Sequence, residues 1–257
     1  GQEIETDLHR TYPGNKSFNI HVDSLGRILR AYSVHNPEVG YAQSMNFICG
    51  MILIEINDEE TAFWIFLSVI DNILPSHYLQ SLLGARVDQR VLEHLMEEHA
   101  PDTWNALHDR EDANYNYLPI MSIPWLLCCY CSIMPTRTTL CVLDNVLYYG
   151  RDFSVATALA IYKMFQKDIV KIVEGHRGDS QRRVRLLVSN LYDRSKLLQG
   201  AHYFFNKISK EHFAELRDYH EAQVKRETAE NQQKRENYQA FFRVDRDADN
   251  YNYLLHW

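Results

Sequence analysis

Residues 40–56 read Gly-Tyr-Ala-Gln-Ser-Met-Asn-Phe-Ile-Cys-Gly-Met-Ile-Leu-Ile-Glu-Ile. Within this stretch the apolar residues recur every three or four positions, which is the period of an α-helix: Met45, Ile48, Cys49, Ile52, Leu53 and Ile56. Because this apolar face is wide, the stretch predicts a central helix that other elements cover on most sides.

The flanking sequence predicts further helices on both sides of this one. Leu25, Ile28, Leu29 and Tyr32 follow the helical spacing, and Asn36-Pro37 ends their helix. After the central stretch, Asp58 supplies a capping oxygen for a helix that Pro75 closes. Similar patterns predict helices over 87–99, 124–133, 138–147, 155–173 and 183–191. With 10 glycines and 7 prolines among 257 residues, we expect an all-α, multi-helix fold without a significant β-sheet.

The domain organisation follows from a shift in composition near residue 206. Residues 1–205 predict one packed helical domain, whose native start is expected to be missing because no helix cap precedes Ile4. Residues 206–257 predict a charged C-terminal helix and an aromatic tail. The charged part, 209–239, is expected to be solvated and projecting, because its apolar stripe stops at Val224. The aromatic residues of 240–257 are expected to pack back on the body.

Composition also excludes several classes of function. A net charge of −7 argues against nucleic-acid binding, which needs many cations to neutralise phosphates. No apolar stretch reaches the roughly 20 residues that span a bilayer, and no signal peptide is visible. The 5 cysteines lie in apolar stretches, so they predict core residues in a reducing compartment and no metal site. The basic run at 181–185 favours a solvated helix face over a site for lipid or an acidic partner. No nucleotide-binding or hydrolase motif is present, so the chain is not expected to be an independent enzyme.

Two short stretches carry recognisable chemistry. Residues 4–13 read Ile-Glu-Thr-Asp-Leu-His-Arg-Thr-Tyr-Pro, and residues 41–43 read Tyr-Ala-Gln. They resemble the two signature motifs of the TBC domain family of Rab GTPase-activating proteins, Ile-x-x-Asp-x-x-Arg and Tyr-x-Gln. Residues 124–135, 142–150 and 159–161 resemble later helices of that family, so the likeness covers roughly residues 1–200 in register.

The resemblance implies a dual-finger activator of a Rab-family small GTPase. Arg10 would stabilise the charge on the transferring phosphoryl group, because a guanidinium stays ionised and its fork of donors matches phosphate oxygens. Gln43 would orient the attacking water and take over from the glutamine of the GTPase. GTP and Mg²⁺ would come with the partner, and the chain would hold no cofactor or metal of its own. Its place would be the cytoplasm, with peripheral association with endomembranes through other regions left open.

Supporting or partner-binding roles are expected for Ile4, Asp7, Tyr41, Ser44 and Asn46. Asp7 lies one helical turn before Arg10, so it is expected to hold the arginine side chain in a productive rotamer. Tyr41 is expected to fix the loop that aims Gln43, and Asn46 to bind nearby backbone.

Alternative interpretations remain open at this point. The family usually has glycine directly after the glutamine, whereas this chain has Ser44. A catalytically weak or inactive TBC-like scaffold that only binds a Rab is therefore the main alternative. Taken alone, Asp7 and Arg10 would form an ordinary surface ion pair worth less than about 1 kcal/mol. An unrelated helical repeat protein is disfavoured, because no period of about 30 to 45 residues is present.

Overall fold

The computed structural model describes residues 2–79, 81–108, 117–175 and 177–253. Over these residues the chain is built from helices without a β-strand element, which confirms the predicted all-α class. The elements are α1 (Gln2–Leu8), α2 (Lys16–Asn19), α3 (Val22–His35), α4 (Met45–Glu55), α5 (Glu59–Ser68), the π-helical η1 (Val69–Ile73), α6 (Leu83–His99), α7 (Pro101–Leu107), α8 (Tyr117–Leu127), α9 (Thr136–Tyr149), α10 (Arg151–Met164), α11 (Gln166–Gly175), the 3₁₀ turn η2 (Arg177–Asp179), α12 (Ser180–Ser189), α13 (Arg194–Lys207) and α14 (Lys210–Tyr253).

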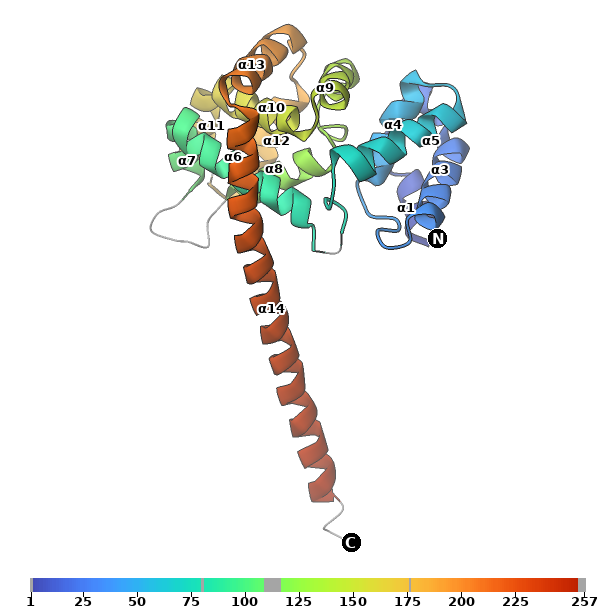
Figure 1. The fold of residues 1–257 in the computed structure, drawn as a ribbon, viewed down its shortest axis with the longest axis vertical. Helices are drawn as coiled ribbons and strands as arrows, with labels where there is room; N and C mark the ends of the chain where they lie inside the picture. The colour runs from blue at the N-terminus through green and yellow to red at the C-terminus, as the bar shows by residue number, and fades with distance from the viewer. Residues whose placement is uncertain (1, 80, 109–116, 176, 254–257) are drawn as a thin grey trace.

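The predicted central helix is α4, and its first nine residues are buried except for the half-buried Phe47. α1, α2, α3 and α5 all pack against it, so its sides are covered by neighbours that are close in the sequence. Figure 1 shows this group at one end of the molecule, with α6 to α13 forming the rest of the body. A helix that is apolar on every side is stable only when it is covered in this way.

α10 is the second helix that the core surrounds. Each residue from 153 to 162 is buried, and α6, α9 and α13 pack on this helix. α13 approaches it closely at Gly200, where an added Cβ would lie 3.2 Å from the Cβ of Ala160. Two small residues therefore set the spacing of this helix pair.

In the second half of the chain, two of the predicted helices differ from those in the structure. The helix predicted over 124–133 is wrong: α8 spans Tyr117–Leu127 with Pro124 inside it, and the chain then turns through positive φ at Cys129 and Tyr130. The single helix predicted over 155–173 is also wrong, because α10 and α11 are separated at Phe165. α13 was not predicted.

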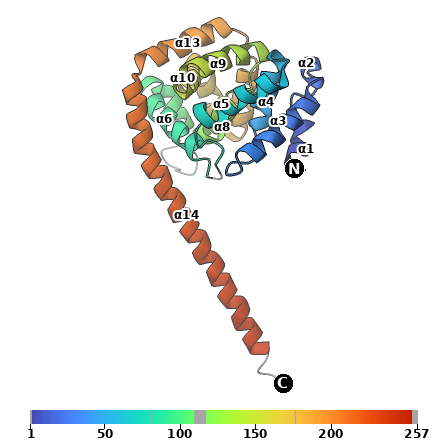
Figure 2. The same cartoon turned by 45° about the vertical axis from the view of Figure 1, so that its right-hand side comes forward.

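α14 projects far from the body, as Figures 1 and 2 show. Its first turns pack on α6, with Phe213, Leu216 and Val224 buried, whereas the residues from 229 to 234 are exposed. The expectation that the segment 240–257 folds back is wrong for the described residues, because α14 continues away from the body through Tyr253. None of the described helices is both long and apolar enough to traverse a bilayer.

A buried ionic cluster fastens α14 to the body. Arg217 of α14 donates to Asp88 of α6 at 2.7 Å and also to Asp152 of α10. His77 Nε2 lies 3.1 Å from the second carboxylate oxygen of Asp88. Burial alone would raise the pKa of Asp88, but the Arg217 charge and His77 outweigh it and hold that pKa below its ordinary value.

Candidate functional site

Arg10 and Gln43 both lie in exposed turns at the ends of helices. Arg10 follows α1, and its backbone N–H donates to the carbonyl of Asp7 at 3.1 Å. Gln43 precedes Ser44, the N-cap residue of α4. Among the described residues the Arg10 guanidinium has no carboxylate partner, so its charge is open to solvent. Each side chain is therefore free to meet a group from outside the chain.

The two segments that carry these residues are joined first by Asp7 and Tyr41. The Tyr41 hydroxyl donates to Oδ2 of Asp7 at 2.7 Å, and Asp7 is only 9% exposed. Burial and this carboxylate both raise the pKa of Tyr41, so the phenol stays protonated as a donor. Asp7 was expected to hold the Arg10 side chain, but its carboxylate is bonded to Tyr41 instead. Its effect on Arg10 therefore passes through the backbone.

A second link connects Thr11 and Asn46. Asn46 Nδ2 donates to Oγ1 of Thr11 at 2.8 Å, and that hydroxyl donates in turn to the carbonyl of Asp7 at 2.7 Å. Both Thr11 and Asn46 are buried, at 2% and 1% exposure. Asn46 was expected to bind nearby backbone, and it reaches the backbone of Asp7 through Thr11. Because this chain of bonds is buried, breaking it would leave polar groups without partners.

Tyr12 makes the third link and extends it to a more distant part of the fold. Its hydroxyl shares one proton between the carbonyls of Phe47, at 2.7 Å, and Cys131, at 3.0 Å. Burial raises the pKa of Tyr12, so this hydroxyl also stays protonated. The turn that carries Arg10 is thereby tied to α4 and to the segment between α8 and α9. We call residues 9–13 the finger turn.

Gly50 allows α4 to approach the finger turn closely. A Cβ added at Gly50 would lie 3.1 Å from side-chain atoms of both Thr11 and Tyr12, and 3.0 Å from Phe18. These contacts are tighter than ordinary van der Waals packing, so a larger residue would push the turn outwards. The site geometry therefore depends on a glycine inside the central helix.

Ser44 has a left-handed backbone, with φ 88° and ψ −22°. This region favours glycine, because a Cβ crowds the following carbonyl there. The Ser44 side chain makes no capping hydrogen bond to the helix. The residue that departs from the family pattern thus occupies a position where glycine has a clear physical advantage.

Ile4 lies in the hydrophobic core at 3% exposure, so it anchors α1 and is not available at the surface. Two residues of the site were missed as functional: Thr11 and Tyr12 belong to the quoted motif, but no role was assigned to them. Their adjacency to Arg10 was the available signal. Within the described residues, no group of three or more His, Cys, Asp or Glu side chains could hold a metal ion.

Comparison with known proteins places this helical architecture in a family. The family model of the Rab-GTPase-TBC domain matches residues 1–170. Growth hormone-regulated TBC protein 1-A of Danio rerio is 34% identical over 66% of this chain and 48% of its own length. TBC1 domain family member 2A of Homo sapiens is 29% identical over 92% of this chain and 25% of its own length. The chain thus spans between a quarter and about half of these curated relatives.

A solved structure agrees with the sequence comparison. The crystal structure of the Chlamydomonas flagellar RabGAP TBC domain superimposes with a TM-score of 0.68 and 28% identity, covering 78% of this chain and 66% of that chain. The helices and the two linked motif segments define a TBC-type helical domain. The chain belongs to the Rab-GTPase-TBC domain family.

Proposed function

We propose that this chain accelerates GTP hydrolysis on a Rab-family small GTPase by supplying Arg10 and Gln43 in trans. The observation that carries the proposal is the set of links between the two segments, Asp7–Tyr41, Asn46–Thr11 and Tyr12–Phe47. They hold the exposed Arg10 and Gln43 on turns that are bonded to each other. The name of the similar Chlamydomonas structure, a RabGAP TBC domain, supports the same activity.

In this mechanism Arg10 stabilises negative charge on the phosphoryl group as it is transferred. A guanidinium suits this role because it is permanently charged and presents several donors in one plane. Arginine fingers contribute about 10³ to 10⁵ in rate to GTPases. The open charge of Arg10 fits this task, because no internal carboxylate among the described residues has to be displaced before phosphate can bind.

Gln43 orients the water that attacks the phosphorus atom. A primary amide suits this role because its carbonyl accepts from the water while its amino group donates to phosphate. GTP and Mg²⁺ both arrive with the GTPase, and a Rab partner would bring the chain to the cytoplasmic surface of endomembranes. The chain's own contribution is to position two side chains, which is the main requirement for phosphoryl-transfer catalysis.

The test is single-turnover GTP hydrolysis on a panel of Rab GTPases, with the wild-type chain, Arg10→Ala and Gln43→Ala. We expect at least one Rab to respond, and each substitution to lower its stimulated rate constant by about 10² or more. A responsive Rab on which the three chains act alike would contradict the mechanism.

A binding scaffold is the second candidate, and the left-handed Ser44 next to Gln43 is the observation that favours it. Under that alternative, GTP-loaded Rab binds the chain without any change in its hydrolysis rate. Binding measured alongside hydrolysis therefore separates the two functions.

A further inference from the structure

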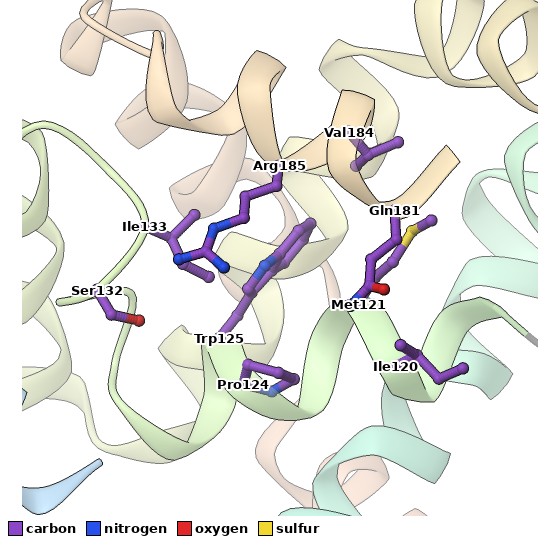
Figure 3. Close-up of a pocket in the computed structure, with 9 residues that line it drawn as sticks. All are labelled: Ile120, Met121, Pro124, Trp125, Ser132, Ile133, Gln181, Val184 and Arg185. Atoms are coloured by element: carbon purple, nitrogen blue, oxygen red, sulfur yellow. The ribbon is translucent and has the colours of Figure 1, made fainter. Parts of the chain in front are cut away.

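A small pocket lies between α8 and α12, separate from the two finger residues. Figure 3 shows its lining: Ile120, Met121, Pro124, Trp125, Ser132, Ile133, Gln181, Val184 and Arg185. Most of these side chains are apolar, and Trp125 is held in place by stacking on Tyr162 at a centroid separation of 5.1 Å. The pocket is thus lined mainly by apolar side chains, with polar side chains from α12 at one side.

The size of the pocket suits one side chain. Its volume is about 70 Å³, whereas pockets for drug-sized ligands and cofactors measure about 300 to 1,000 Å³. Small, well-packed hollows of this kind hold the anchor residues of protein partners, which dominate binding energy. Ile120 stands beside the hollow at 55% exposure and adds apolar surface at its edge.

The pocket is connected to the finger turn through the backbone. Ser132 and Ile133 line it, and they directly follow Cys131, whose carbonyl accepts the hydroxyl of Tyr12 at 3.0 Å. Tyr12 is two residues from Arg10. The finger turn and the pocket are therefore joined by one short segment of the chain.

Arg185 gives the pocket a charge preference. Its side chain extends from α12 toward Ile133, beside the Trp125 ring (Figure 3). Arg185 is exposed and has no carboxylate partner among the described residues, in a chain whose net charge is −7. A carboxylate next to an apolar side chain would satisfy both the guanidinium and the hollow.

We infer that this pocket is a specificity site for the GTPase, which takes one apolar side chain of the partner while Arg185 pairs with a neighbouring carboxylate. The inference rests on the proposed function, because the same GTPase must meet the finger turn. It assigns recognition to α8 and α12 and leaves the chemistry with Arg10 and Gln43.

The test compares matched pairs of surface variants, so that folding is not at risk. Arg185→Glu is paired with Arg182→Glu, an exposed residue on the same helix that does not line the pocket. Ile120→Ala is paired with Leu186→Ala, because the two side chains are 55% and 54% exposed. The readouts are the dissociation constant for Rab loaded with a non-hydrolysable GTP analogue, and kcat and KM for stimulated hydrolysis.

We expect Arg185→Glu to raise the dissociation constant and KM by about 10-fold or more, and Ile120→Ala by about 3- to 10-fold. Both variants should leave kcat within about 2-fold of wild type, because neither residue touches the nucleotide. Arg182→Glu and Leu186→Ala should behave like wild type in both readouts.

The inference would be overturned if the two variants of either matched pair changed the dissociation constant equally. It would also be overturned if no Rab of the panel bound the chain. Vesicles of phosphatidylserine serve as a further probe: if Arg182→Glu and Arg185→Glu equally weaken vesicle binding and neither changes Rab affinity, the surface is a lipid-docking face and the inference is overturned. The proposed function is judged separately by Arg10→Ala, which should lower kcat while leaving binding of the analogue-loaded Rab in place.

Discussion

The hydroxyl of Tyr41 donates a 2.7 Å hydrogen bond to Oδ2 of Asp7, joining the end of α1 to the segment that precedes α4. This bond links one residue from each signature motif. It also explains how two turns that are far apart in the sequence keep a fixed position relative to each other. Asp7 and Tyr41 hold the segments that carry Arg10 and Gln43. Among the described residues, neither Arg10 nor Gln43 makes a side-chain hydrogen bond to Asp7 or Tyr41.

Tyr41→Phe should therefore weaken both stability and catalysis. It removes the donor and leaves the Asp7 carboxylate buried without that partner, which costs about 1 to 3 kcal/mol of unfolding free energy. Urea denaturation measures this loss, and stimulated hydrolysis should show a lower kcat with little change in Rab affinity. Tyr192→Phe is the control, because Tyr192 is 72% exposed. Equal stability of the two variants would show that the Asp7–Tyr41 bond does not matter.

Ser44→Gly should stabilise the chain. A residue with a Cβ pays about 1 to 2 kcal/mol in the left-handed region, while glycine raises the entropy cost of folding by about 0.4 to 1 kcal/mol. The net gain in unfolding free energy is then between about 0 and 1.6 kcal/mol, with a midpoint of about 0.8 kcal/mol. Ser44→Ala keeps the Cβ and loses no capping bond, so it should stay near wild type. If glycine proved less stable than alanine at this position, the strain argument would be wrong.

Arg217→Ala should loosen the attachment of α14 to the body. It leaves Asp88 buried at 1% exposure without its closest cation, and loss of one partner from a buried ion pair costs about 3 to 5 kcal/mol. Limited proteolysis should then cut within α14 much faster than in the wild-type chain. Arg226→Ala, at an exposed position of the same helix, should cause neither effect. Similar behaviour of the two variants would exclude Arg217 as the anchor.

The same cluster predicts a loss of stability in acid. Arg217 and His77 hold the pKa of Asp88 below its ordinary value although burial opposes this. As pH falls, the unfolded chain takes up this proton first, near a pKa of about 3.9, so the stabilising contribution is present above that pH and lost below it. Unfolding free energy measured from pH 6 to pH 3 should fall less steeply in Asp88→Asn. If the unfolding free energy fell equally steeply with pH in Asp88→Asn and in the wild type, Asp88 would not be the cause of the acid sensitivity.

Much of this fold was predictable from local patterns. The apolar run from Met45 predicts the central helix. Asp58 caps the next helix, because its carboxylate accepts a hydrogen bond from the Thr61 N–H at 2.8 Å. The helix around Pro124 was misplaced because proline is common in a first turn, yet here the helix begins at Tyr117. The turn that follows has positive φ at Cys129 and Tyr130. Neither residue is glycine, so the sequence carries no signal for this turn.

The site was predictable only in part, for a different physical reason. Arg10 and Gln43 stand out because their motifs are local in the sequence. The bond from Tyr12 to Cys131 spans 119 positions, and that from Arg217 to Asp88 spans 129. Such contacts arise from the packing of distant helices, so no spacing rule along the chain could reveal them. Asp7 illustrates the limit: its spacing from Arg10 suggested a direct pair, whereas burial directs it to Tyr41.

In the proposed mechanism Gln43 replaces the GTPase's own catalytic glutamine while Arg10 supplies the charge. Its most direct test is the single-turnover rate constant of a responsive Rab, measured in a two-by-two design. One factor is Gln43 or Gln43→Ala in this chain, and the other is the Rab with or without its own glutamine. The account predicts that Gln43→Ala lowers the stimulated rate by about 10² or more, and that removing the Rab glutamine leaves most of the stimulation in place. Stimulation that survives Gln43→Ala but disappears with the Rab glutamine would contradict the account.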